Sequence, residues 1–188
     1  AARRVPFELE DGLEVRIFGE LSVYPARGDL QIIVREVEPR GVGALQLAFE
    51  QLRTRLEAEG LFDASEKREL PAQPRRIGVV TSARGAAVHD VIRVLAERAP
   101  DIPLLLAPAT VQGENAPAEI ESALRNVSAQ EDVDVVLLVR GGGGAFDLAS
   151  FNTERVARAI RATRVPVVCG VGHEVDVTIA DLAADLRA

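Results

Sequence analysis

The chain has 188 residues, 47% of them hydrophobic, and a formal net charge of −7 at pH 7. This composition indicates a globular protein of one or two domains and argues against disorder. No apolar run approaches the roughly 20 residues that span a bilayer, and no basic-then-apolar leader opens the chain, so we expect a cytoplasmic protein without membrane contact. The negative charge argues against nucleic-acid binding through the summed surface field, but a local basic cleft is compatible with it.

Two extended segments open the sequence. Residues 13–24 and 29–37 alternate partly between apolar and polar side chains, and YPARG between them favours a turn, so the sequence predicts one β-hairpin. Two strands alone do not make a stable sheet. We therefore expect residues 1–42 to be the end of a domain whose beginning is missing. We also expect the chain to stop inside a helix, at 180–188.

A connector follows the hairpin. Residues 43–60 carry leucine and alanine at helical spacing and end on Gly60, a residue type that often terminates helices. The polar, proline-bearing stretch 61–76 is typical of a linker. The sequence therefore predicts a connector helix and linker over 43–76 and a separate domain over 77–188.

Short apolar runs alternate with amphipathic segments through the rest of the chain. The runs cover residues 77–82, 102–109, 134–139 and 166–172, each followed by a predicted helix, the last from Val177. This alternation is typical of a parallel sheet covered by helices on both faces. We predict an α/β fold with a doubly wound, mostly parallel sheet of about four or more strands. Cys169, in the last run, is expected to be a small buried side chain.

Ligands of open α/β sheets bind at the carboxyl ends of the strands, so function is expected there. At the end of the first run, Ser82, Arg84 and Gly85 lead into a helix, whose first N–H groups can bind an anion. The Gly-Lys-Ser/Thr pattern of a Walker loop is absent. Asp90, one turn into that helix, is either a functional acid or a solvated partner of the helix dipole. A polar segment, 107–115, also follows the second run.

Four consecutive glycines follow the arginine that ends the third run. Such a backbone can close around a phosphate as a nest of amide donors, so this segment predicts a phosphate or oxyanion site. The alternatives are a flexible surface loop and an arginine that pairs with carboxylates. The residues expected to act here are Arg140, Gly141, Gly142 and Gly143. Ser150 and Asn152 come next, and capping of the following helix is the default role for both.

A histidine and two acids, His173, Glu174 and Asp176, follow the last run. A histidine near neutrality exchanges protons with water or a leaving group, and a nearby carboxylate fixes its tautomer or acts as the base. At a predicted ligand edge, this cluster favours catalysis over an inert surface histidine. Acids that could bind metal ions are present, but no spacing defines a metal site. An Arg–His–Asp set, in contrast, can stabilise and protonate a phosphodiester transition state without an ion.

The sequence resembles the large-subunit family of exodeoxyribonuclease VII over nearly its whole length. The resemblance is carried by VVTSARGAAVHDVIRVL, ATVQGENAPAEI, VRGGGGAFDLASFNTERVARAI and PVVCGVGHEVDVTIADLAADLRA, with RGGG…SFN and VGHE-x-DVT specific to that family. It implies that residues 1–42 are the last hairpin of an OB-fold that binds single-stranded DNA and that 77–188 form the catalytic domain. The chain departs from the family pattern at 144–149, where Ser-Leu-Glu-Asp-Leu-Trp is expected, and at Val175, where threonine is expected.

The resemblance further implies hydrolysis of single-stranded DNA to oligonucleotides without metal or cofactor. It also implies a complex with several copies of a small helical subunit, held by a region outside this chain. Carried over residue by residue, it assigns catalysis to Asp90, Arg140, His173 and Asp176. The expected phosphate or DNA contacts are Ser82, Arg84, Gly85, Gly141, Gly142, Gly143, Ser150 and Asn152. We expect this chain alone to be weakly active or inactive.

Two other classes of function compete with the nuclease. A flavodoxin-like regulatory domain would use the glycines to bind a nucleotide or phosphate, and His173 would be structural. A metal-dependent phosphoesterase would lose activity in chelator. Loss of turnover with retained DNA affinity in His173→Ala would distinguish a nuclease from a binding domain.

Overall fold

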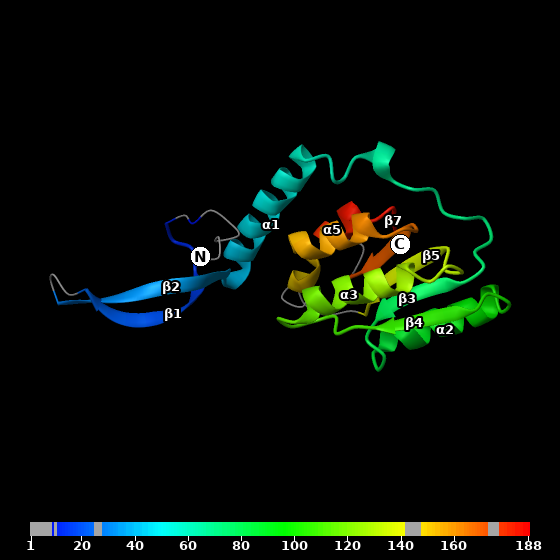
Figure 1. Ribbon diagram of the computed structural model, residues 1–188, viewed down its shortest axis with the longest axis horizontal. Coiled ribbons are helices and arrows are strands. Elements are labelled where there is room, and N and C mark those ends of the chain that lie inside the picture. The colour runs from blue at the N-terminus through cyan, green and yellow to red at the C-terminus, as the bar shows by residue number, and fades with distance from the viewer. Residues whose placement is uncertain (1–8, 10, 25–27, 142–147, 173–176) are drawn as a thin grey trace. The chain divides into compact units, whose positions relative to one another are not determined.

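The computed structural model in Figure 1 describes residues 9, 11–24, 28–141, 148–172 and 177–188. The chain divides into two compact units, Ala1–Arg55 and Leu56–Ala188. The first contains an antiparallel hairpin and the second a parallel α/β sheet.

The first unit contains the predicted hairpin. Strands β1 (Val15–Tyr24) and β2 (Asp29–Pro39) pair antiparallel, and the register shifts between Phe18 and Gly19. Large apolar side chains on both strands are exposed, as a two-stranded sheet requires. They are Ile17, Phe18, Leu21, Val23, Tyr24, Leu30, Ile32, Ile33 and Val34.

The predicted connector helix is confirmed as α1 (Gly41–Ala58). It ends where the sequence suggested, because Gly60 adopts a left-handed φ of 75° that only glycine takes up without strain. The Gly60 N–H donates to the Glu57 carbonyl at 2.9 Å, and the Leu61 N–H donates to the Leu56 carbonyl at 3.0 Å. These two bonds satisfy carbonyls that the end of the helix would otherwise leave open.

The predicted linker, residues 61–76, lies within the second unit and hydrogen-bonds to it. It contains one 3-10 turn, η1 (Ala64–Glu66). Arg68 donates to Asp185 and to the Thr163 carbonyl. The segment is therefore attached to the α/β unit, while the domain boundary at residue 77 stays a prediction.

The second unit has a five-stranded parallel sheet of order β4-β3-β5-β6-β7. Its strands are β3 (Ile77–Thr81), β4 (Leu104–Pro108), β5 (Val135–Arg140), β6 (Val167–Val171) and β7 (Leu186–Arg187). Its helical elements are α2 (Ala86–Arg98), α3 (Ala116–Ser128), the 3-10 turn η2 (Ala149–Phe151), α5 (Glu154–Ala162) and α6 (Ile179–Ala183). The predicted α/β class and doubly wound sheet are confirmed. Among the described residues, no helix is long and apolar enough to cross a membrane.

Helices cover both faces of this sheet (Figure 1). On one face, the buried Ile77 and Val79 pack with Val91 and Leu95 of α2. On the other face, Gly78 lies under α3, where an added Cβ would meet Val127 Cγ2 at 2.6 Å. Alternate residues of β3 thus contribute to two separate apolar layers, as expected for a central parallel strand.

The helix predicted from Val177 to the chain end was wrong in its extent. Helix α6 ends at Ala183, Ala184 is extended, and β7 follows parallel to β6. The reason lies in Asp185, which accepts the Val167 N–H at 2.7 Å and is bound by two arginines. These contacts hold the chain against the sheet edge, where it adds a strand.

Cys169 is fully buried in β6, as predicted. Burial raises the pKa of its thiol well above the ordinary value, and the nearby charge of Asp181 adds to that effect. A neutral, buried thiol is a poor nucleophile. Cys169 is therefore a packing residue.

An exposed arginine controls the ionisation of Asp134. The Arg75 side chain donates to Oδ1 at 2.7 Å, and the Arg75 backbone N–H donates to Oδ2 at 2.7 Å. These two hydrogen bonds, of which the side-chain bond has the larger effect, lower the pKa of Asp134 from 3.8 to about 2. A depressed folded-state pKa stabilises the fold above the ordinary pKa, and that contribution is lost as pH falls through the folded value.

We therefore expect Asp134→Asn to lower the urea midpoint near neutral pH and to approach the wild-type midpoint as the pH falls from 3.8 toward about 2. Circular dichroism can follow unfolding, since the chain has no tryptophan. Asp101→Asn, at an exposed carboxylate, serves as the control. A gap between wild type and Asp134→Asn that stayed constant with pH would contradict the assignment.

Candidate functional site

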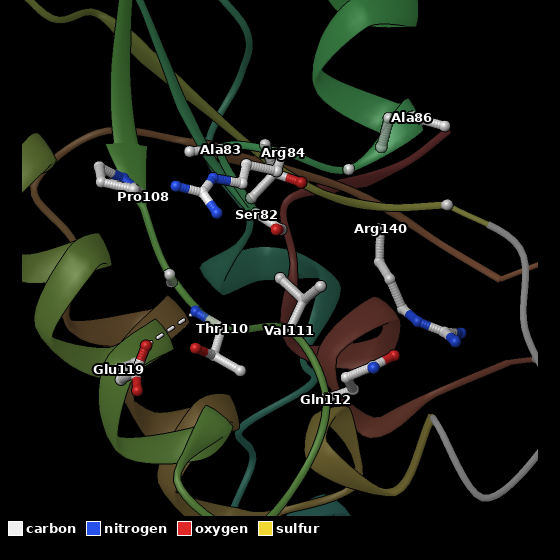
Figure 2. Close-up of a pocket in the computed structure, with 15 residues that line it drawn as sticks. Ser82, Ala83, Arg84, Ala86, Pro108, Thr110, Val111, Gln112, Glu119 and Arg140 are labelled. Carbon is white, nitrogen blue, oxygen red and sulfur yellow. Dashed lines mark hydrogen bonds between the residues drawn. The ribbon is translucent and has the colours of Figure 1, made fainter.

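The order of the strands in the sheet indicates where a ligand is expected to bind. Going along the chain, β4 is added on one side of β3, whereas β5, β6 and β7 are added on the other. Ligands of doubly wound sheets bind at the carboxyl ends of the strands at this switch point. A cleft of about 640 Å³ opens there, at the ends of β3, β4 and β5 (Figure 2).

The connection from β3 to α2 forms one wall of the cleft. Ser82, Arg84 and Gly85 all line it, and their expected contact with phosphate or DNA stays a prediction. Gly85 is the N-cap of α2 and provides no side chain to cap it. The first N–H groups of α2, at Ala86 and Ala87, therefore lack intrahelical acceptors and lie at the cleft. Such a helix start favours an anion.

The end of β5 forms a second wall. Arg140 is the last residue of the strand, is 7% exposed and lines the cleft with Gly141. A Cβ added to Gly141 would lie 3.9 Å from the backbone nitrogen of Ala87. The structure thus brings Arg140 and Gly141 to the start of α2. Gly142 and Gly143 lie outside the described residues.

The third wall comes from the end of β4 and was missed in part by the sequence reasoning. Thr110, Val111 and Gln112 line the cleft, together with Glu119 of α3. Glu119 Oε2 accepts the Thr110 N–H at 2.8 Å, drawn as the dashed line in Figure 2. This backbone bond lowers the pKa of Glu119. The segment was recognised as a polar strand end, and an acid in the first turn of the next helix was the available signal for Glu119.

The charges around the cleft favour an anion. Arg84 and Arg140 line it, and in Figure 2 Val111 lies between their side chains. Among the described lining residues the one carboxylate is Glu119, which already accepts a backbone N–H. Arginine binds phosphate oxygens through paired N–H donors. The chain is acidic as a whole, but this cleft offers positive charge locally.

Asp90, a predicted catalytic acid, lies elsewhere on the surface. It is exposed on α2, 3.4 Å from Arg93 Nη2, and is not among the residues that line the cleft. This exposure suits the alternative of a solvated acid. Its catalytic role stays a prediction.

Ser150 and Asn152 are not among the residues that line the cleft either. Ser150 Oγ donates to the Gly113 carbonyl, and Asn152 Oδ1 accepts the Ile179 N–H. The expectation that one of them caps α5 was wrong, because Thr153 accepts the Val156 N–H at that position. Their contact with DNA stays a prediction.

The predicted catalytic residues His173 and Asp176 lie outside the described part of the chain. Within the described residues, no group of three or more histidine, cysteine, aspartate or glutamate side chains is placed to hold a metal ion. The described lining of the cleft contains two arginines, Arg84 and Arg140, and one carboxylate, Glu119, among polar and apolar residues.

The fold defines an α/β domain, and the arginines and the helix start at one edge of its sheet are suited to an anion. Residues 61–188 match the family described as exonuclease VII, large subunit, and residues 1–38 match an OB-fold nucleic acid binding domain. The chain belongs to the exonuclease VII large-subunit family. Membership favours the nuclease interpretation over the regulatory domain.

Individual relatives agree with this family. The chain is 54% identical over all of its length to the exodeoxyribonuclease 7 large subunit of Thioalkalivibrio sulfidiphilus, covering 42% of that protein. It is 52% identical to that of Syntrophotalea carbinolica and 50% identical to that of Cronobacter sakazakii, over 99% of the chain and 46% and 41% of those proteins. The chain thus spans less than half the length of these relatives.

Proposed function

We propose that the chain carries the phosphodiester-hydrolysing site of an exonuclease that degrades single-stranded DNA to oligonucleotides. The observation that carries the proposal is the position of Arg140, which ends β5 and lines the same cleft as the start of α2. The scissile phosphate binds there. The names of the relatives, all exodeoxyribonuclease 7 large subunits, support this substrate.

In the proposed mechanism, the cleft stabilises charge. Arg140 donates two N–H groups to the phosphoryl oxygens, and the amides at Gly141 and the start of α2 bind the charge that develops as the phosphate is attacked. Arg84, exposed at the cleft, contacts the DNA backbone. Because these donors are fixed by the fold, little reorganisation is needed in the transition state.

Proton transfer is assigned to residues named from the sequence. His173 moves a proton to or from the reacting oxygens, and Asp176 or Asp90 orients it or activates the attacking water. No metal ion takes part in this mechanism. The arginine and the amides supply the electrostatic stabilisation that a cation would otherwise give.

We also propose the setting in which this site acts. The N-terminal hairpin belongs to an OB-fold that binds single-stranded DNA, and several copies of a small helical subunit complete the enzyme in the cytoplasm. The match of residues 1–38 to an OB-fold nucleic acid binding domain supports the DNA contact. Since this chain lacks more than half the length of its relatives, it is weakly active or inactive alone.

The test uses the full-length protein with its small subunit and an end-labelled single-stranded oligonucleotide in excess chelator. We expect oligonucleotide products from the wild type, and loss of turnover with retained DNA affinity in His173→Ala. Hydrolysis abolished by the chelator would identify a metal-dependent phosphoesterase. Binding of a nucleotide or phosphate with no hydrolysis under any condition would identify a regulatory domain.

A further inference from the structure

The turn η2 joins the connections that follow three strands. It lies after the β5 connection, and Ser150 Oγ donates to the carbonyl of Gly113, between β4 and α3, at 3.3 Å. Asn152 Oδ1 accepts the N–H of Ile179, after β6, at 2.9 Å. Phe151 between them is completely buried and anchors the turn in the core. Residues 150–152 are therefore hydrogen-bonded both to the connection that follows β4 and to the connection that follows β6.

The hydrogen bond that Asn152 accepts satisfies a backbone N–H group at the start of α6. Thr178 and Asp181 form a capping box, in which the Asp181 N–H donates to Thr178 Oγ1 at 3.2 Å and the Thr178 N–H donates to Asp181 Oδ2 at 2.8 Å. These bonds leave the N–H of Ile179, the first helical residue, without a local acceptor. Asn152 supplies one from 27 residues away.

The start of α6 matters because of what precedes it in the sequence. Ile179 follows Asp176 by three residues and His173 by six. Asn152, in turn, follows Arg140 by twelve residues. A bond between Asn152 and Ile179 therefore joins the segment that follows Arg140 to the segment that follows the proposed proton-transfer residues.

We infer that Ser150 and Asn152 are positioning residues and not DNA ligands, and that Asn152 acts through its Oδ1 acceptor to fix the start of α6 relative to the segment that follows Arg140. This inference rests on the proposed function. It replaces the DNA contact expected for these residues with the contacts that the structure gives them.

The chemistry of the asparagine amide separates the two roles. A phosphate oxygen would bind the Nδ2 donor, whereas the Ile179 N–H binds the Oδ1 acceptor. Asn152→Asp keeps an acceptor for Ile179, and its negative charge is favourable at a helix N-terminus. The same change removes the donor and repels a phosphate. The two roles therefore predict opposite results for one substitution.

The experiment measures kcat, KM and DNA affinity for the full-length protein with its small subunit on a single-stranded oligonucleotide. We expect Asn152→Ala to lower kcat about 100-fold, because small displacements of reacting groups have effects of this size, while KM and DNA affinity change less than about threefold. We expect Asn152→Asp to recover activity to within about fivefold of the wild type. Ser150→Ala is expected to lower kcat by about tenfold at unchanged KM.

The matched control is Asn126→Ala, at an exposed asparagine of α3. An Asn152→Asp variant as impaired as Asn152→Ala, with raised KM and weakened DNA binding, would show that Asn152 binds DNA and would overturn the inference. An Asn152→Ala variant with wild-type kcat would also overturn it. If Asn152→Ala did not fold, Asn152→Asp against the wild type would decide.

The same assay separates this inference from the function on which it rests. Hydrolysis by the wild type, with Asn152→Asp no better than Asn152→Ala, would leave the proposed nuclease intact and remove the positioning role. No hydrolysis by the wild type would remove both, because the positioning role has meaning only for a reaction at this site.

Discussion

Replacing Arg140 with alanine or lysine is expected to lower kcat on single-stranded DNA by about a hundredfold to a thousandfold, the usual loss for one donor that stabilises a transition-state oxyanion. Arg140 is 7% exposed at the end of β5, so little water competes with the phosphate for its N–H groups. Lysine keeps the charge but lacks the planar pair of donors that matches two phosphate oxygens. We therefore expect Arg140→Lys to be nearly as impaired as Arg140→Ala.

Two other arginines make this measurement specific. Arg98→Ala removes the same charge from the last turn of α2, at an exposed position, and is expected to leave kcat unchanged. Arg84→Ala, at an exposed cleft residue, is expected to raise KM more than it lowers kcat. Circular dichroism and urea midpoints show whether the Arg140 variants are folded. Folded Arg140 variants with wild-type kcat would remove Arg140 from the mechanism.

The sheet and one side of the cleft could be predicted from the sequence because both depend on local patterns. A strand buried on both faces reads as a continuous apolar run, and β3 (Ile77–Thr81) and β5 (Val135–Arg140) do so up to their last residue. Arg140 interrupts such a run with a charge, which marks the end of a strand. Since the carboxyl ends of parallel strands meet at one edge, the residues after β3 and β5 had to lie together.

The contacts between distant segments could not be predicted in the same way. Asn152 stands directly before Thr153, and either residue type caps helices, so the local pattern gave no reason to pair Asn152 with Ile179. Glu119 reads as an ordinary acid in a first helical turn until the structure places it on the Thr110 N–H. These roles depend on which strands are neighbours, and the order β4-β3-β5-β6-β7 leaves no local trace in the sequence.

Residues 180–188 are a second place where contacts with distant segments, and not the local pattern, decide the structure. The pattern of residues 180–188 suits a helix, but Asp185 binds Arg68 of the supposed linker and Arg161 of α5. Both partners are distant in sequence, and their ion pairs with Asp185 end α6 after five residues. Tertiary contacts here override helix propensity, which is worth less than about 1 kcal/mol per residue.

Asp185→Ala is expected to be the most destabilising of the substitutions considered, by about 3–5 kcal/mol, the usual cost of breaking a buried ion pair by removing one partner. Its side chain is 0% exposed and accepts from Arg68 Nη2 at 2.8 Å, Arg161 Nη1 at 3.0 Å and the Val167 N–H at 2.7 Å. Alanine would leave these donors without the Asp185 carboxylate, and its share of the contacts that hold β7 and residues 61–76 to the sheet would be lost.

The pH dependence of this contribution has a defined sign. Burial opposes ionisation of Asp185, but the hydrogen bonds from the Arg68 side chain, the Arg68 N–H and the Val167 N–H outweigh it, so its pKa lies below the ordinary value. The stabilisation is therefore complete above about pH 4 and is lost as the pH falls through the lower folded-state pKa. Urea midpoints of wild type and Asp185→Ala, followed by circular dichroism, should converge in acid.

A double-mutant cycle tests whether the carboxylate acts through its arginines. Arg161→Gln combined with Asp185→Asn is expected to cost less than the sum of the two single changes, since each single change breaks the same ion pair. Asp101→Asn, at an exposed carboxylate, should change the free energy of unfolding by less than about 0.5 kcal/mol. If the bonds of the buried Asp185 carboxylate support the fold, its removal must lower the free energy of unfolding. Equal urea midpoints for wild type and Asp185→Ala near neutral pH would therefore show that other contacts hold β7 and residues 61–76.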